Sequence, residues 1–141
     1  MAFVDIVIPT YKRAILLPET LSSVQQQTFA DWRCFVAEDG QTVETSAAVA
    51  PFLKDSRFLY LPGRHCGTPA GPRNRAIRQG SAPLIAFLDD DDLWLPEKLD
   101  VQMQFMEKHP GCVLLGANAY RWNGKCHSVI GSSLFFSKPP A

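Results

Sequence analysis

Short apolar runs alternate with amphipathic stretches along most of the chain. Runs of four to six mostly apolar residues, bounded by turn residues, are typical of strands that are buried on both faces of a sheet. Such runs cover residues 3–8, 32–37, 58–61, 84–88 and 112–116. The sequence therefore predicts five strands, and beyond Ala117 the periodic pattern fades.

Helical spacing separates these runs. Apolar residues three and four positions apart predict a helix that begins at Pro18 and ends near Gln25, with Leu17, Leu21 and Val24 on its buried face. Further helices are expected over residues 45–53, over a segment that ends at Gly80, and from Pro96 to a stop at Pro110.

Three details of these helices are specific expectations. In the helix over residues 45–53, Val49, Phe52 and Leu53 are expected to face inward. Gly80 is expected to end its helix in the left-handed conformation that glycine adopts easily. Pro72 is expected to delay the start of the same helix.

Regular alternation of strand and helix with short connections predicts the fold class. It indicates an α/β protein with a Rossmann-like, open twisted, mainly parallel sheet and helices on both faces. The 141 residues suit a single domain over 1–141. In such sheets ligands bind beyond the carboxyl ends of the strands, so the residues that follow each strand are the candidates for function.

Charge and composition narrow the possible partners. The 14 basic and 14 acidic side chains cancel, which argues against a sequence-independent nucleic-acid binder. The longest apolar runs are far shorter than the roughly 20 residues that cross a bilayer. The first residues carry no basic cluster of the kind that opens a secretory signal. We expect a cytoplasmic protein without a transmembrane segment.

The cysteines form no recognisable motif. They lie at Cys34, Cys66, Cys112 and Cys126, without a C-x-x-C pair or matching histidine spacing. Four free thiols are the favoured interpretation, and two disulfides remain an alternative that a reducing compartment disfavours.

The loop after the first strand, residues 9–13, reads Pro-Thr-Tyr-Lys-Arg. It has neither the glycines of a dinucleotide-binding loop nor the Gly-Lys of a Walker loop. Tyr11 offers an aromatic face on which a base can stack, with the Thr10 hydroxyl and the Arg13 cation beside it. The alternative is a solvated surface loop.

An acid and a group of arginines follow the next strands. Asp39 comes after the second strand and could accept hydrogen bonds from a nucleotide, although Asp-Gly is also an ordinary turn signal. Between Ser56 and Leu88 there are five arginines and no acid, and Arg73 lies near the start of a predicted helix. A helix N-terminus beside a cation favours an anion such as phosphate.

Four consecutive aspartates, residues 89–92, follow the fourth strand. Carboxylates this close repel one another, which raises their pKa values unless a cation compensates. Mg²⁺ or Mn²⁺ takes one or two carboxylates and completes its shell with water and phosphate oxygens. Asp89 and Asp91 therefore suggest a clamp for a metal and a diphosphate. Acids placed to favour the following helix N-terminus are the alternative.

Taken together, these segments resemble the family 2 glycosyltransferases of the GT-A fold. The resemblance rests on motifs in order: Val7-Ile8-Pro9-Thr10-Tyr11, Gln27-Thr28-Phe29, Glu38-Asp39-Gly40, Arg73-Asn74 and residues 86–96 around the aspartates. It covers the chain to about Gly116. Glu38 is one departure, since the family often has aspartate there.

What the resemblance implies is a nucleotide-diphosphate-sugar donor, usually a UDP-sugar, and an unknown acceptor. The implied nucleotide-binding residues are Pro9, Thr10, Tyr11, Arg13, Asp39, Arg73, Asp89 and Asp90. Asp91 and Asp89 are the implied ligands of Mn²⁺ or Mg²⁺, and Asp92 would support them. Association with the inner face of the membrane and a homo-oligomer are further possibilities.

The implied chemistry is an inverting transfer, in which an acceptor hydroxyl attacks the anomeric carbon. In the family the general base lies in the acceptor-binding half, well past the aspartates, and here no Asp or Glu follows Glu107. The catalytic base is therefore unknown, and the chain is expected to stop before the acceptor-binding half. A module that binds the donor without transferring it is the main alternative, and a dehalogenase-type phosphatase is a weaker one.

Overall fold

The computed structural model describes residues 3–122, 127–130 and 135–137. It divides into two compact units, Met1–Leu99 and Asp100–Ala141. A single domain over 1–141 stays a prediction.

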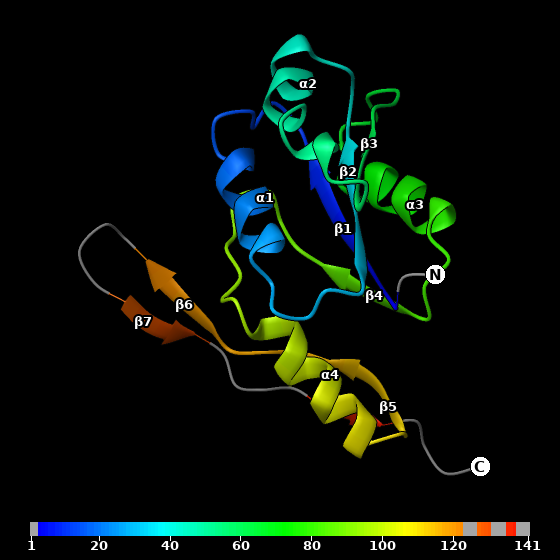
Figure 1. Ribbon diagram of the computed structural model, residues 1–141. Helices are drawn as coiled ribbons and strands as arrows, with labels where there is room; N and C mark the ends of the chain where they lie inside the picture. Colours follow the sequence, from blue (N-terminus) through cyan, green and yellow to red (C-terminus); the bar gives the residue numbers. More distant parts are fainter. Residues whose placement is uncertain (1–2, 123–126, 131–134, 138–141) are drawn as a thin grey trace. The chain divides into compact units, whose positions relative to one another are not determined.

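A parallel sheet is the centre of the first unit (Figure 1). Its strands are β1 (Val4–Thr10), β2 (Trp32–Glu38), β3 (Phe58–Leu61) and β4 (Leu84–Phe87), in the order β3-β2-β1-β4. All neighbouring pairs are parallel, which confirms the predicted fold class. Because β1 lies between β2 and β4, the loops that follow these three strands meet at one edge of the sheet.

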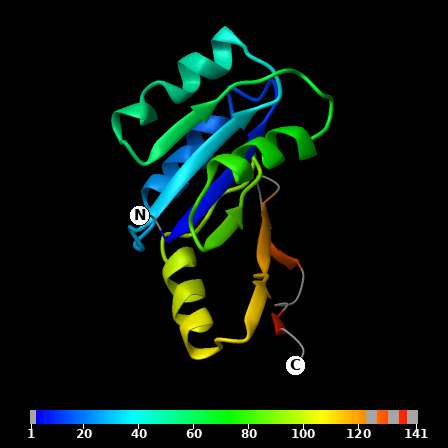
Figure 2. The same cartoon turned by 90° about the vertical axis from the view of Figure 1, so that its right-hand side faces the viewer.

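Helices cover both faces of this sheet, as the sequence predicts. Helices α1 (Leu17–Gln25) and α2 (Val43–Val49) lie on one side, and α3 (Ala70–Gln79) lies on the other (Figures 1 and 2). Leu17, Leu21 and Val24 of α1 are completely buried. Ala76 of α3 packs in one cluster with Val7, Phe35 and Ala37 of the sheet. In the described part of the chain no helix is long and apolar enough to cross a bilayer.

The helix expected over residues 45–53 is shorter and begins earlier. It starts at Val43, because the Thr42 hydroxyl accepts a hydrogen bond from the Thr45 amide at 3.2 Å and caps the helix. It stops before Pro51, which has no amide hydrogen, and a 3₁₀ turn, η1 (Phe52–Lys54), follows. The prediction that Leu53 faces inward is wrong, since its side chain is exposed.

Pro72 does not delay α3. The helix begins at Ala70, so Pro72 lies in its first turn, where a backbone amide has no partner within the helix. Proline therefore fits this position without the loss of a hydrogen bond.

In the second unit the strands pair antiparallel. Helix α4 (Lys98–Lys108) crosses the unit boundary and begins two residues after Pro96. Strand β5 (Cys112–Leu115) pairs with β8 (Phe135–Ser137), and β6 (Ala119–Trp122) pairs with β7 (His127–Ile130). The expectation that residues 112–116 extend the parallel sheet is therefore wrong, because β5 pairs antiparallel with β8. Strands β6, β7 and β8 lie beyond Ala117, where the periodic pattern of the sequence fades. Strands of three or four residues are too short to give a clear periodic pattern.

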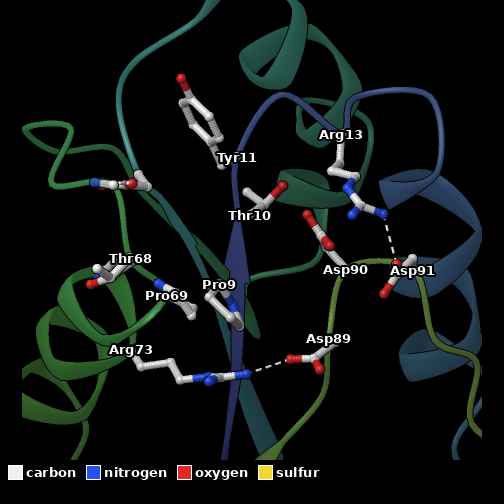
Figure 3. A pocket seen from close by; sticks show the side chains of 13 residues that line it. Pro9, Thr10, Tyr11, Arg13, Thr68, Pro69, Arg73, Asp89, Asp90 and Asp91 are labelled. Carbon is white, nitrogen blue, oxygen red and sulfur yellow. Dashed lines mark hydrogen bonds and ion pairs between the residues drawn. The ribbon is translucent and has the colours of Figure 1, made fainter.

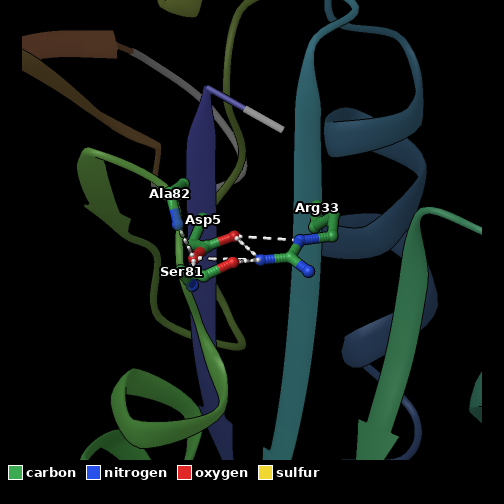
Figure 4. Close-up of polar contacts among 4 residues, drawn as sticks. All are labelled: Asp5, Arg33, Ser81 and Ala82. Atoms are coloured by element: carbon green, nitrogen blue, oxygen red, sulfur yellow. Dashed lines mark hydrogen bonds and ion pairs between the residues drawn. The ribbon is translucent and has the colours of Figure 1, made fainter. Parts of the chain in front are cut away.

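A buried carboxylate ties the first unit together at the start of β1 (Figure 4). Asp5 is only 2% exposed, and it accepts hydrogen bonds from Arg33 of β2 at 3.0 Å and from the Ser81 and Ala82 amides at 2.7 and 2.8 Å. Since these amides belong to the turn between α3 and β4, Asp5 fixes the entry of β4 beside β1.

Gly80 is required by this carboxylate and not by its backbone conformation. Its φ is −73°, so the left-handed cap expected from the sequence is wrong. A Cβ at Gly80 would collide with Oδ2 of Asp5. Glycine is needed because the helix end and the carboxylate approach so closely.

We predict that Gly80→Ala lowers the free energy of unfolding by about 1–3 kcal/mol, because the new methyl group must displace a carboxylate held by three partners. Denaturant titration measures this change. Gly111→Ala is the matched control, since nothing lies within 4 Å of a Cβ there. Equal stability of the two variants would contradict the assignment.

Candidate functional site

A pocket of about 480 Å³ lies at the carboxyl ends of β1 and β4 (Figure 3). All the residues predicted to bind the nucleotide or the metal contribute to its lining: Pro9, Thr10, Tyr11, Arg13, Asp39, Arg73, Asp89, Asp90 and Asp91. Asp92, predicted to support them, does not line the pocket. The pocket also includes residues to which the sequence assigned no role of their own: Gly67, Thr68, Pro69 and Pro72. The structure thus brings all the predicted binding residues together, while the role of each residue stays a prediction.

The pairing of β1 with β4 explains why these residues meet. Val7 is the register partner of Phe87, and the Leu88 amide donates to the Val7 carbonyl at 3.2 Å. Residues 89–91 therefore leave the sheet beside Thr10, the last residue of β1.

Two of the aspartates are paired with arginines from separate elements (Figure 3). Arg13, in the loop before α1, donates to Asp91 at 2.6 Å, and Arg73 of α3 donates to Asp89 at 2.5 Å. All four side chains are between 33% and 56% exposed. Ion pairs this exposed contribute little stability, so a ligand can replace either partner at small cost.

The crowding of the carboxylates affects the pKa values of Asp90 and Asp92. Burial raises the pKa of Asp90, and the neighbouring charge of Asp91 adds to that rise, while the Thr10 hydroxyl and Arg13 oppose it. The pKa of Asp92 is also raised, first by burial and then by Asp91 and Asp89. The expected effect of crowding is therefore present at both residues.

The donor set suits a divalent ion that is shared with a ligand. Among the residues that the structure describes, no three His, Cys, Asp or Glu side chains form a ready metal cage. Mg²⁺ and Mn²⁺ are hard ions, and Mg²⁺ typically takes one or two carboxylates and completes its octahedron with water and phosphate oxygens. Asp89 and Asp91, which both line the pocket, match this requirement.

Asp39 anchors the loop that forms another wall of the pocket. Its carboxylate accepts hydrogen bonds from the Cys66 amide at 2.7 Å and the Gly67 amide at 2.9 Å, and a ring nitrogen of His65 lies 3.0 Å away. Burial alone would raise the pKa of Asp39, but the bonds from Cys66 and Gly67 and the charge of His65 outweigh it and lower that pKa. Asp39 is therefore an ionised acceptor, and both of its carboxylate oxygens hold residues 65–67, with the Cys66 thiol as a further donor at 3.0 Å.

Tyr11 presents an aromatic surface at the rim. Its ring is 41% exposed and stacks on the His65 ring, with 4.6 Å between centroids and 15° between planes. His65 was not predicted from the sequence, because no local pattern shows that it reaches a tyrosine 54 positions earlier.

The N-terminus of α3 opens toward the pocket. Thr68 and Pro69 line it, and Pro69 caps the helix without a side-chain hydrogen bond, so the first amides are available to an anion. Of the five arginines in the acid-free segment, Arg73 is the one that lines the pocket. Arg75 instead donates to the Glu38 and Leu61 carbonyls, and Arg78 is exposed.

The cysteines play different parts. Cys34 and Cys112 are buried free thiols, Cys66 is an exposed free thiol, and Cys126 lies outside the described residues. Burial raises the pKa of the Cys34 thiol, which makes that thiol unreactive.

Comparison with known proteins decides the family. The profile of the family described as glycosyl transferase family 2 matches residues 5–126. The chain belongs to this family. The resemblance found in the sequence is thereby confirmed.

Two curated Escherichia coli relatives are named as UDP-Glc:alpha-D-GlcNAc-diphosphoundecaprenol beta-1,3-glucosyltransferases. WfgD is 37% identical over 106 residues, which cover 75% of this chain and 42% of WfgD. WfaP is 33% identical over 107 residues, which cover 76% of this chain and 42% of WfaP. The chain thus spans less than half the length of either relative.

Solved structures confirm the GT-A fold. Staphylococcus aureus TarS 1–349 in complex with UDP matches with a TM-score of 0.73 and 26% identity, over 78% of this chain and 33% of that one. A mannosyltransferase from Pyrobaculum calidifontis, in complex with GDP-Man and Mn²⁺, matches with a TM-score of 0.68 over 74% of this chain and 32% of that one. At 21% identity, the second likeness concerns the fold alone.

We predict that Asp39→Ala speeds hydrogen exchange at the Cys66 and Gly67 amides, because both lose their acceptor. In the unchanged chain their protection should persist below the pH at which an ordinary aspartate is protonated, since the lowered pKa of Asp39 delays its protonation.

Asp31→Ala removes the same charge from an exposed position and is the control. Unaltered exchange in Asp39→Ala would show that the carboxylate does not hold this loop.

Proposed function

We propose that this chain is the donor-binding part of a glycosyltransferase that transfers a sugar from a UDP-sugar to an acceptor hydroxyl with inversion and with a divalent metal. The observation that carries the proposal is the pocket in which an aromatic ring, two arginines and several aspartates meet. Each group matches one part of a nucleotide diphosphate.

The base and ribose belong at the side of Tyr11 and Asp39. Tyr11 offers an exposed ring for stacking, and Thr10 and Pro9 form the floor beside it. Residues 65–67 already make four contacts with the two Asp39 oxygens, so a hydrogen bond from the base would replace one of them, such as that of the weakly donating Cys66 thiol at 3.0 Å. The TarS structures with UDP and with UDP-GlcNAc support the choice of uridine.

The diphosphate belongs between Arg13, Arg73 and the N-terminus of α3. Asp91 and Asp89 would hold Mn²⁺ or Mg²⁺, with Asp90 on the nucleotide side and Asp92 supporting the cluster. A divalent ion held there supplies positive charge that stabilises the departing diphosphate. Arg13 and Arg73 exchange their carboxylate partners for phosphate oxygens as the donor binds, so both guanidinium charges stay compensated throughout.

The acceptor is proposed from the relatives. WfgD and WfaP are named for sugars on diphosphoundecaprenol, so a polyprenyl-diphosphate-linked sugar is the acceptor class that we propose here. Such an acceptor would place the protein at the inner surface of a membrane. The general base remains unassigned, because no Asp or Glu follows Glu107.

The pocket residues all match the donor or its metal, and this observation supports one second candidate, a module that binds the donor without transferring it. Both candidates bind UDP and metal in the same way, and turnover separates them. Release of UDP from a UDP-sugar by this chain supports the enzyme, whereas binding without release supports the module.

We predict that Mn²⁺ strengthens UDP binding by roughly 100-fold and that Asp91→Ala removes this gain, because a metal ligand in the pocket is lost. Titration calorimetry with UDP in Mn²⁺ and in EDTA measures this gain. Asp31→Asn is the control, since Asp31 is an exposed aspartate that does not line the pocket. If both variants keep the gain, the metal clamp is wrong.

A further inference from the structure

We propose that three side chains of the α1 segment, Thr20, Ser23 and Gln27, are positioning residues that set the place of the aspartate segment. This inference rests on the proposed function, because it assigns them to the metal and diphosphate end of that site. None of the three lines the pocket.

The three side chains bond the backbone of residues 90–99 directly. The Thr20 hydroxyl donates to the Asp90 carbonyl at 3.1 Å, and the Ser23 hydroxyl accepts from the Trp94 amide at 3.2 Å. Gln27 uses both ends of its amide: Nε2 donates to the Leu95 carbonyl at 2.8 Å, and Oε1 accepts from the Leu99 amide at 3.0 Å. All of these contacts lie within the first unit.

Helical spacing makes this arrangement possible. Positions 20 and 23 are three residues apart and share one face of α1. Gln27 lies two residues beyond the helix end at Gln25, and its Nε2 is tied to this face by a hydrogen bond to the Ser23 carbonyl at 3.2 Å. The exposures of the three residues are 1%, 9% and 7%. Buried polar groups are costly without partners, and the backbone of residues 90–99 supplies them. This face of α1 is therefore matched to a polypeptide backbone and not to apolar side chains.

Other backbone bonds of this segment are those of a loop: the Leu88 amide donates to the Val7 carbonyl, the Asp92 amide to the Asp89 carbonyl, and the Thr28 amide to the Pro96 carbonyl. Residues 88–97 contain no helix or strand, so their backbone lacks the regular hydrogen bonds of such elements. The Asp90 carbonyl belongs to the peptide between Asp90 and Asp91. By fixing this peptide, Thr20 sets the direction in which the Asp91 side chain points.

The same helix also positions a partner of the aspartates. Arg13 lies four residues before the start of α1 and donates to Asp91. The amides of Leu16 and Leu17 both bond the Arg13 carbonyl at 3.0 Å, which ties this loop to the helix. Helix α1 thus fixes the position of Arg13 relative to the aspartate segment. A shift of the helix face against this segment would separate the pair and move the carboxylates that we propose bind the metal.

Thr20→Val tests this assignment, because valine keeps the size of threonine and removes the hydroxyl. UDP affinity is measured in Mn²⁺ and in EDTA. We expect an affinity about tenfold weaker in Mn²⁺ and unchanged in EDTA, since the base end of the pocket is not held by Thr20. Thr20→Ser, which restores the hydroxyl, should restore the affinity in Mn²⁺.

Ser22→Ala is the matched control, because the Ser22 hydroxyl accepts from the neighbouring Gln26 side chain at 3.2 Å and not from the aspartate segment. It should leave both affinities unchanged. If Thr20→Val does not fold, Gln27→Glu replaces it, since glutamate keeps an acceptor for Leu99 and loses the donor to Leu95.

Two outcomes would overturn the inference while leaving the proposed function intact: an unchanged affinity in Mn²⁺, or an equal loss in Mn²⁺ and EDTA, which would indicate a general structural role. An unaltered chain that binds UDP equally well in Mn²⁺ and EDTA would overturn the proposed metal clamp and this inference with it.

Discussion

Repulsion among the carboxylates at the end of β4 is the constraint on which the site depends. Burial and repulsion raise the pKa of Asp90 and Asp92, while Asp89 and Asp91 each meet an arginine. In the function that we propose, the cluster exchanges its exposed arginine partners for a divalent ion, and the arginines bind phosphate instead. The four neighbouring aspartates are thus more readily explained by the binding of a ligand than by a contribution to the stability of the fold.

Buried side chains that bond backbone groups hold the loops around this cluster. Asp5 fixes the entry of β4, Asp39 fixes residues 65–67, and the polar face of α1 fixes the segment after β4. Glu38 is also completely buried, and it accepts from the Tyr60 and Thr42 hydroxyls; burial would raise its pKa, but the bonds from Tyr60, Thr42 and Thr45 lower it. Glutamate in place of the family's frequent aspartate is therefore satisfied here by its own partners.

Local pattern was enough to predict the parallel sheet, and the resemblance to the family completed the predicted set of site residues that the pocket contains. Strands show as apolar runs, and the carboxyl ends of parallel strands meet at one edge, so the order of residues along the chain was enough to group Thr10, Asp39 and Asp89. What failed depends on contacts between distant residues. The need for glycine at position 80 comes from Asp5, and the role of His65 comes from its stacking on Tyr11. The role of Thr20 comes from its hydrogen bond to Asp90, 70 positions later. No spacing rule within one element contains that information.

The most direct test of the account is anomalous X-ray diffraction from crystals of this chain grown with UDP and Mn²⁺. The account predicts a manganese peak bonded to a carboxylate oxygen of Asp91 or Asp89, with the pyrophosphate beside it in contact with Arg13 or Arg73. UDP bound elsewhere, or manganese absent from these carboxylates with both arginine pairs intact, would contradict it.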